Sequence, residues 1–134
     1  MPLSSGRTGR PISRVQFEVI TKKFLVFLKR ELHIIDNIPL VLIDNLEFSV
    51  KNHSFACIVP ETKTIYLSIL NRHPIDVLRS LAHEVVHYKQ LMSGQLVSGK
   101  TGSKYENEAN AKAGELMRKY GALHPEYFQL TAIK

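Results

Sequence analysis

A long apolar helical pattern between residues 74 and 94 constrains the fold more than any other feature of the chain. Pro74 suits the first turn of a helix, Asp76 adds a favourable negative charge there, and Gly94 marks a C-terminal stop. Between them, apolar residues recur at helical spacing: Ile75, Leu78, Leu81, Ala82, Val85, Val86 and Leu91. This pattern predicts a helix that is apolar enough to be the central one of the fold.

The other elements give an α+β pattern around this helix. Ser13 and Gln16 have the capping-box spacing, so a helix is expected over about 14–32. A third helix is expected over about 104–120, with Gly121 as its C-terminal signal. Apolar and alternating runs predict strands at 40–43, 53–59 and 64–68, and residues 48–50 extend the first or form a short strand of their own. We therefore expect an α+β fold with three main helices and a three-stranded, mostly antiparallel sheet.

Length and composition indicate one domain. The chain has 134 residues, enough for one hydrophobic core but not for two. Residues 1–12 are expected to form a flexible N-terminal arm, and residues 13–134 a single domain. The sequence contains neither a stretch of roughly 20 apolar residues nor a secretory signal, which favours a cytoplasmic protein without a membrane partner. Since Cys57 is its one cysteine, any metal site must be built from histidines and carboxylates.

The basic charge of the chain favours an anionic partner. The net charge is +6, and seven basic residues fall in the first 30 positions: Arg7, Arg10, Arg14, Lys22, Lys23, Lys29 and Arg30. They are interleaved with apolar residues at helical spacing, so the solvated face of an amphipathic helix is the preferred interpretation. Contact with nucleic acid is the alternative, although no nucleic-acid-binding motif accompanies the charge.

The residues His83-Glu84-Val85-Val86-His87 match the pattern H-E-x-x-H on the central helix. Residues four apart lie on one face of a helix, so both imidazoles can reach one metal ion. Two neutral imidazoles supply half of the tetrahedral shell that zinc prefers. Glu84 lies beside the first ligand, where its carboxylate can take a proton from a zinc-bound water and deliver it to a leaving amine. The motif therefore predicts Zn²⁺ bound by His83 and His87, with Glu84 as catalytic base and acid.

A catalytic zinc site needs a third protein ligand and an open fourth position. The third predicted helix offers the carboxylates Glu106, Glu108 and Glu115. Glu106 shares the small, apolar face of that helix with Asn110, whereas Glu108 lies among lysines on the solvated side. We expect Glu106 to be the third metal ligand, with Glu108 in reserve, and Asn110 to accept an N–H from a ligating imidazole. For Glu106 the alternative is an ordinary first-turn acid.

This arrangement resembles the gluzincins, in which H-E-x-x-H on one helix is followed by a glutamate on a later helix. The segment from Tyr105 to Ala113 is similar to the E-x-x-A-N segment of the ImmA/IrrE-like metallopeptidases, and the size resembles minimal single-domain gluzincins of microbes and phages. The resemblance covers residues 60–120. It implies a zincin-like fold whose small sheet lies above the motif helix and whose edge strand holds the substrate as an added strand. By position, residues 64–68 are expected to be that edge.

Two departures limit the resemblance. The Leu-Leu-x-Pro run that often follows the glutamate helix in the ImmA/IrrE-like group is replaced by Glu115-Leu116-Met117-Arg118, which puts a role in repressor cleavage in doubt. SprT-like proteases fit the size and charge, but their third ligand is usually a histidine. His124 is the one histidine downstream of the motif, and it is interpreted as a solvated tail residue.

The pattern and the resemblance together imply a zinc-dependent metallopeptidase that hydrolyses peptide bonds in a protein or peptide substrate. One alternative is a zinc-binding phage structural or regulatory module without turnover, which the intact Glu84 argues against. The other is a SprT-like protease that acts on DNA-bound proteins. The sequence does not select an oxyanion-stabilising residue, and the candidates are Tyr105, Tyr120, Tyr127 and His124. Cys57 is interpreted as a small buried residue, and the natural substrate and oligomeric state stay open.

Overall fold

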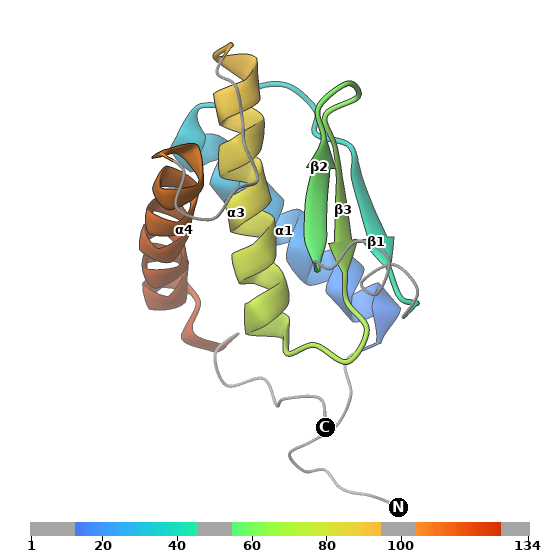
Figure 1. The fold of residues 1–134 in the computed structure, drawn as a ribbon. Coiled ribbons are helices and arrows are strands. Elements are labelled where there is room, and N and C mark those ends of the chain that lie inside the picture. The colour runs from blue at the N-terminus through green and yellow to red at the C-terminus, as the bar shows by residue number, and fades with distance from the viewer. Residues whose placement is uncertain (1–12, 46–54, 95–103, 127–134) are drawn as a thin grey trace, which may run out of the picture.

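The computed structural model describes residues 13–45, 55–94 and 104–126, which form three helices and three strands (Figure 1). The helices are α1 (Arg14–Leu32), α3 (Pro74–Met92) and α4 (Lys104–Leu123). The strands are β1 (Leu40–Ile43), β2 (Ala56–Val59) and β3 (Thr64–Ser68). The expected α+β fold with three helices and a three-stranded sheet is confirmed.

Several expectations concern other parts of the chain. The N-terminal arm at 1–12, the short strand at 48–50 and the first two residues of the strand expected at 53–59 lie outside the described residues. So do most of the loop at 93–103 and the end of the chain from residue 127. These expectations therefore stay predictions from sequence.

The sheet is mixed, which differs from the mostly antiparallel pairing that we expected. Its strand order is β1-β3-β2, with β2 antiparallel and β1 parallel to β3. A tight turn joins β2 to β3, in which Lys63 has a φ of 58° and donates its N–H to the Val59 carbonyl, so these two strands must pair antiparallel. The chain between β1 and β3 includes β2 and is long enough to allow a parallel pair.

The position of β3 in the centre of the sheet changes which strand faces the site. Since β2 occupies one edge and contacts α3, β2 is the edge strand beside the motif helix (Figure 1). The expectation that residues 64–68 form the edge is wrong. The reason is that β1 pairs with β3 on the side opposite β2, a long-range pairing that position along the chain does not reveal.

Local signals explain where the helices begin, and less well where they end. At the start of α1, Ser13 Oγ accepts from the Gln16 N–H at 3.1 Å and Gln16 Oε1 accepts from the Ser13 N–H at 2.8 Å, which confirms the capping box. At the start of α3, His73 Nδ1 accepts from the Ile75 N–H at 3.0 Å. Helix α4 continues through Gly121 to Leu123, because glycine is tolerated inside a helix and does not by itself end one.

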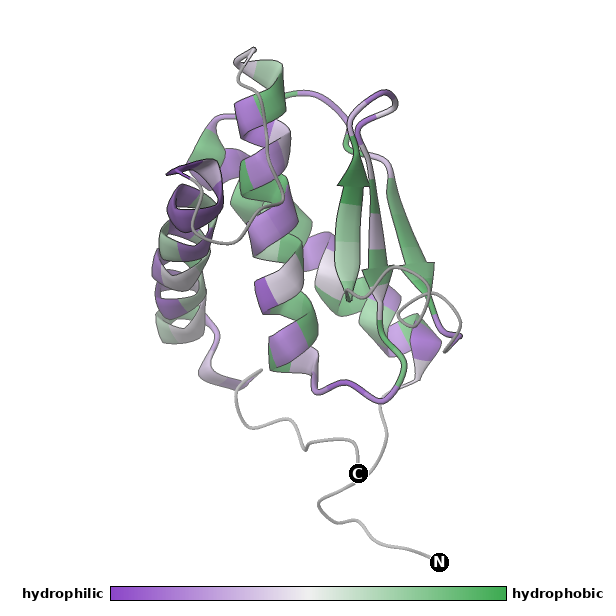
Figure 2. Ribbon diagram, in the orientation of Figure 1, coloured by the Kyte–Doolittle hydropathy of each residue, from purple (hydrophilic) through white to green (hydrophobic). Residues whose placement is uncertain are grey.

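Helix α3 lies between the sheet and α4 and contacts both, with α1 packed against it as well (Figure 1). Five of its apolar side chains have no exposed surface: Val77, Leu78, Leu81, Ala82 and Val85. Figure 2 shows mostly hydrophobic strands and helices on which hydrophobic and hydrophilic residues alternate. The expected central helix is thus confirmed. Within the described residues, none of the helices has the length and hydrophobicity that crossing a bilayer requires.

Candidate metal centre

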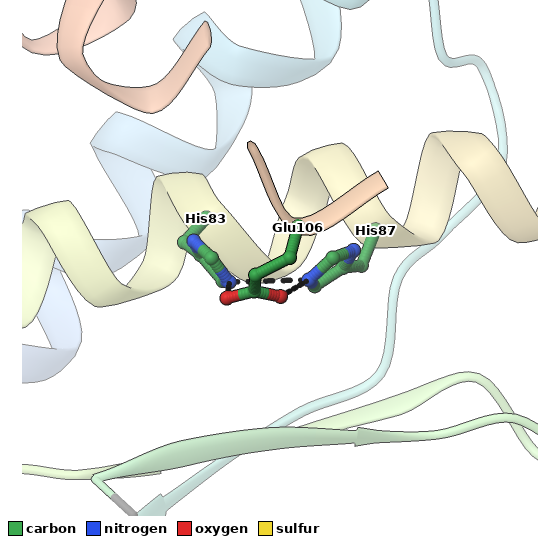
Figure 3. A group of neighbouring side chains, drawn as sticks. All are labelled: His83, His87 and Glu106. Atoms are coloured by element: carbon green, nitrogen blue, oxygen red, sulfur yellow. Dashed lines mark hydrogen bonds and ion pairs between the residues drawn. The ribbon is translucent and has the colours of Figure 1, made fainter. Parts of the chain in front are cut away.

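Helices α3 and α4 bring three metal-ligand side chains to one point (Figure 3). His83 and His87 lie one turn apart on α3, and Glu106 lies in the first turn of α4. The Nε2 atoms of the two histidines are 3.1 Å apart. Glu106 Oε2 lies 3.0 Å from His83 Nε2, and Glu106 Oε1 lies 3.0 Å from His87 Nε2. The three residues expected from sequence as ligands therefore form a group that could hold a metal ion.

The three side chains form a triangle whose donor atoms lie close enough together to bind one metal ion. Ligands about 2.0–2.1 Å from zinc at tetrahedral angles are about 3.3 Å from one another. The distances of 3.0–3.1 Å between these side chains are similar, and they involve both oxygens of Glu106, since Oε2 faces His83 and Oε1 faces His87. Three donors on one face leave a fourth position for water or substrate, as in catalytic sites.

The buried side chain of Gln90 fixes the ring of His87. Its Oε1 lies 2.7 Å from His87 Nδ1. Its Nε2 donates to the Tyr105 carbonyl at 3.1 Å and to Glu108 Oε1 at 2.5 Å, both on α4. Since both amide hydrogens are used there, the amide oxygen must accept a hydrogen from His87 Nδ1. The neutral His87 ring consequently has its lone pair on Nε2, which faces Glu106.

This tautomer means that the contact between His87 and Glu106 joins two hydrogen-bond acceptors. A lone pair 3.0 Å from a carboxylate oxygen is unfavourable unless a cation lies between them or the ring takes up a second proton. A metal ion satisfies both acceptors at once. Two imidazole nitrogens and one carboxylate are a donor set that suits zinc, so the residues present fit this ion.

The first histidine of the motif, His83, also contacts a side chain of α4. The side chain of Asn110 forms a hydrogen bond with His83. Burial lowers the pKa of His83, and this effect exceeds the opposing influence of the Glu106 carboxylate and the Asn110 hydrogen bond. The His83 ring therefore favours the neutral form, which is the form that binds a metal.

Glu108 and Gln90 lie beside the triangle. The reserve ligand Glu108 is exposed and lies outside the three-ligand group, where it accepts the hydrogen bond from Gln90. Gln90 itself was not anticipated as part of the site. The signal that could have indicated it is its position three residues after His87, because residues three apart share a helix face.

Glu84 lines the same pocket as His83. Its side chain is largely buried, with 8% of the residue's surface exposed, and it lines the pocket together with His83. Burial raises the pKa of Glu84 to about 7, against the opposing influence of His87. A bound divalent cation would act in the opposite direction, because a nearby positive charge favours the carboxylate form.

The pocket beside the triangle has a volume of about 350 Å³. Phe55 and Ala56, at the start of β2, form one wall. The side chains of Arg79 and Ser80 lie one turn before the motif on α3, and Asn110 of α4 lines the pocket as well. The candidate metal centre thus opens onto a cavity bounded by the edge strand and the motif helix.

The weaker candidates do not line this pocket. Tyr120 lies in the core, where it is 2% exposed, and the centre of its ring is 4.6 Å from the centre of the His124 ring. His124 in turn lies within ion-pair distance of the Glu126 carboxylate. Cys57 is half-buried on β2 rather than fully buried, and burial raises the pKa of its thiol. Neither these three residues nor Tyr105 is among the described residues that line the pocket. Tyr127 lies outside the described part of the chain.

Comparison with models of known protein families, with curated proteins and with solved structures finds no match to this chain. The resemblance to gluzincins and to ImmA/IrrE-like metallopeptidases therefore depends on the motif residues alone. What the structure adds is the group of His83, His87 and Glu106 that could hold a metal ion.

Proposed function

We propose that this protein is a zinc-dependent metallopeptidase. The observation that carries the proposal is the open triangle of His83, His87 and Glu106 at a pocket that Glu84 also lines. Structural zinc sites surround the ion with four protein ligands, whereas catalytic sites use three and keep one position open. Among the described residues this site has three ligands and an acid beside the open side, which is the composition that hydrolysis requires.

Each residue of the site has a defined task in this proposal. His83, His87 and Glu106 would hold the zinc ion, and the ion would supply the charge that lowers the pKa of a water and polarises a carbonyl oxygen. Gln90 and Asn110 hold the two imidazoles so that their Nε2 atoms face Glu106. Glu84 takes the proton of the attacking water and delivers it to the leaving amine. Because Glu84 is buried except toward the pocket, water and substrate reach it from the same side.

The edge strand gives a reason to propose a protein or peptide substrate. β2 forms an edge of the described sheet, and residues at its start line the pocket. An extended peptide can add to such an edge through backbone hydrogen bonds. Binding along β2 would place a peptide bond beside the metal ligands, and we propose this strand, not β3, as the substrate-binding edge.

The alternative of a protease on DNA-bound proteins would use the basic residues of α1. Lys22 and Lys23 are exposed there, but three exposed valines interrupt the basic surface: Val15, Val19 and Val26. A nucleic-acid site is usually a continuous basic stripe. We therefore keep a peptide as the proposed partner, and salt-dependent DNA binding that is lost on reversing Lys22 and Lys23 would favour the alternative.

The decisive experiment combines metal analysis with a catalytic variant. Purified protein is expected to retain about one zinc per chain after dialysis, and Glu106→Ala to lower zinc affinity by more than about 100-fold. Glu84→Gln should keep the zinc and lower the rate of casein or peptide hydrolysis by about 10²- to 10⁴-fold. The matched control is Glu115→Gln, which removes an exposed carboxylate of α4 and should change neither quantity.

Four outcomes would contradict the proposal. Protein without zinc, or hydrolysis that persists in a strong chelator, would remove the metal from the reaction. Zinc bound with the expected dependence on Glu106, but with no hydrolysis of any peptide, would instead favour a zinc-binding module without turnover. Unchanged hydrolysis by Glu84→Gln would exclude Glu84 as the general base.

A further inference from the structure

The pocket continues from the metal ligands toward the N-terminal half of α3, where its lining becomes basic. Arg79 lines it four residues before His83, so the two side chains lie on the same face of the helix. Ser80 and Phe55 complete this end of the pocket. Arg79 thus contributes a cationic residue to the lining of the cavity that would receive a substrate.

A second arginine, Arg72, contacts two of the residues that line this end of the pocket. Arg72 Nη2 donates to Ser80 Oγ at 2.8 Å, and its guanidinium carbon is 4.5 Å from the centre of the Phe55 ring. Its remaining hydrogen bonds go to the backbone carbonyls of Ser68 and Asp76. Among the described residues no carboxylate lies within ion-pair distance of Arg72, so neutral groups hold its charge beside the pocket.

Asp76 balances the charge of the two arginines only in part. Asp76 Oδ1 lies 3.5 Å from Arg79 Nη1, and the two side chains are 57% and 58% exposed. An exposed pair at this distance contributes little and breaks readily when a better partner arrives. The Arg79 end of the pocket therefore keeps a positive potential, which the net charge of +6 reinforces.

We propose that this end of the pocket binds a carboxylate of the substrate, and that Arg79 determines a preference for it. The carboxylate belongs either to an acidic side chain or to the C-terminus of the substrate chain. This inference rests on the proposed peptidase function. An arginine can bind a carboxylate through two parallel hydrogen bonds, which gives geometric selectivity as well as charge selectivity.

The direction of β2 assigns the carboxylate to one side of the cleaved bond. β2 and α3 point the same way in Figure 1, so the start of β2 lies beside the N-terminal half of α3. A peptide that adds antiparallel to β2 runs from the C-terminal half of α3 past the metal ligands toward Arg79. The residues that follow the cleaved bond are then the ones that reach Arg79.

The test uses matched peptides that differ in one group. One series carries Glu, Gln or Lys at each of the three positions after the cleaved bond and an amidated C-terminus. A second series ends two or three residues after that bond, with a free or an amidated C-terminus. Cleavage is measured with the zinc-loaded protein, and binding with zinc-loaded Glu84→Gln by fluorescence anisotropy, so that affinity is read without turnover.

We expect the Glu peptide or the free C-terminus to be favoured about fivefold over its neutral counterpart, in cleavage and in binding. Arg79→Gln should remove this ratio, and so should raising the salt concentration to about 0.5 M. Lys22→Gln removes an exposed charge on α1 instead and should keep the ratio. Comparison of the two series shows whether the selected carboxylate belongs to an acidic side chain or to the C-terminus of the substrate.

Equal binding and cleavage of charged and neutral peptides would overturn this inference while leaving the peptidase intact. An acid preference that survives Arg79→Gln, or one confined to residues before the cleaved bond, would overturn it as well. If no peptide is cleaved, the proposed function fails, and the binding series with Glu84→Gln still decides whether Arg79 selects a carboxylate.

Discussion

The two ends of α4 are attached to the rest of the molecule by different chemistry. At the N-terminal end the contacts to α3 are polar: the Tyr105 carbonyl and Glu108 accept from Gln90, and Glu106 faces both histidines of the motif. At the C-terminal end the buried contacts are apolar, and an ion pair at the surface joins Lys119 to Glu31 of α1 at 2.6 Å. The centre of the Tyr120 ring lies 4.6 Å from the centre of the Phe24 ring and 4.9 Å from that of the Phe27 ring, both on α1.

This difference separates stability from metal binding along a single helix. Burial of large apolar side chains contributes the dominant favourable term in folding, so the C-terminal end should anchor α4 whether or not a metal is bound. The N-terminal end places a carboxylate against the lone pair of His87, a contact that a cation makes favourable. Metal removal should therefore loosen the first turn of α4 and leave its last two turns in place.

The largest effect is expected at the apolar end, from Tyr120→Ala. Truncating a buried aromatic side chain leaves a cavity and typically costs about 3–5 kcal/mol in the free energy of unfolding. Urea unfolding of the metal-free protein measures this loss. Zinc affinity of the molecules that remain folded should stay the same, because the metal ligands lie at the other end of α4. A loss of less than about 1 kcal/mol in the free energy of unfolding, or a large loss of zinc affinity, would contradict the assignment of stability to the C-terminal end of α4 and of metal binding to its N-terminal end.

A smaller effect is expected at the polar end, from Gln90→Ala. Without the amide oxygen the His87 ring loses the partner that fixes its tautomer, and loss of such a partner typically lowers metal affinity by about 10- to 100-fold. Competition with a chromophoric chelator measures the affinity. The ¹⁵N chemical shifts of the ring report the tautomer, which in the metal-free wild-type protein should carry its hydrogen on Nδ1.

The control for Gln90 is another helical glutamine with a structural hydrogen bond. Gln16→Ala removes the side chain that accepts from the Ser13 N–H, so it should weaken the start of α1 by about 1 kcal/mol or less. Zinc affinity and the His87 tautomer should not change. If Gln16→Ala lowered zinc affinity as much as Gln90→Ala, the effect would reflect general stability and not the orientation of His87.

The elements of the fold could be predicted from the sequence because their signals are local. The strand at 40–43 and the helix beginning at Pro74 follow from runs of apolar residues and from cap residues that act within a few positions. The pairing of β1 with β3 is a contact between segments more than twenty residues apart, and its direction depends on how the intervening chain folds. The sheet order, and with it the edge strand, therefore needed the structure.

In the candidate metal centre, too, local features could be predicted from the sequence and contacts between distant residues could not. Glu106 was distinguished from Glu108 by helix phase, because phase decides which side chains of α4 can face α3. The role of Gln90 depends on three groups that it contacts at once, on two helices. A single sequence contains no sign that these groups meet. Helix phase could have placed Gln90 on the side of His87, but not its partners.

The smallest effect is expected from Glu108→Gln, and it separates a ligand from a supporting residue. The amide introduced by this substitution would still offer an oxygen to Gln90, although an amide accepts more weakly than a carboxylate, so zinc affinity should fall only by about two- to fivefold. Glu106→Gln, measured by the same chelator competition, should lower it by more than about 100-fold. Equal losses in the two variants would make Glu108 a ligand. A small loss for Glu108 alone would show that the polar end of α4 binds the metal through one carboxylate and orients His87 through the other.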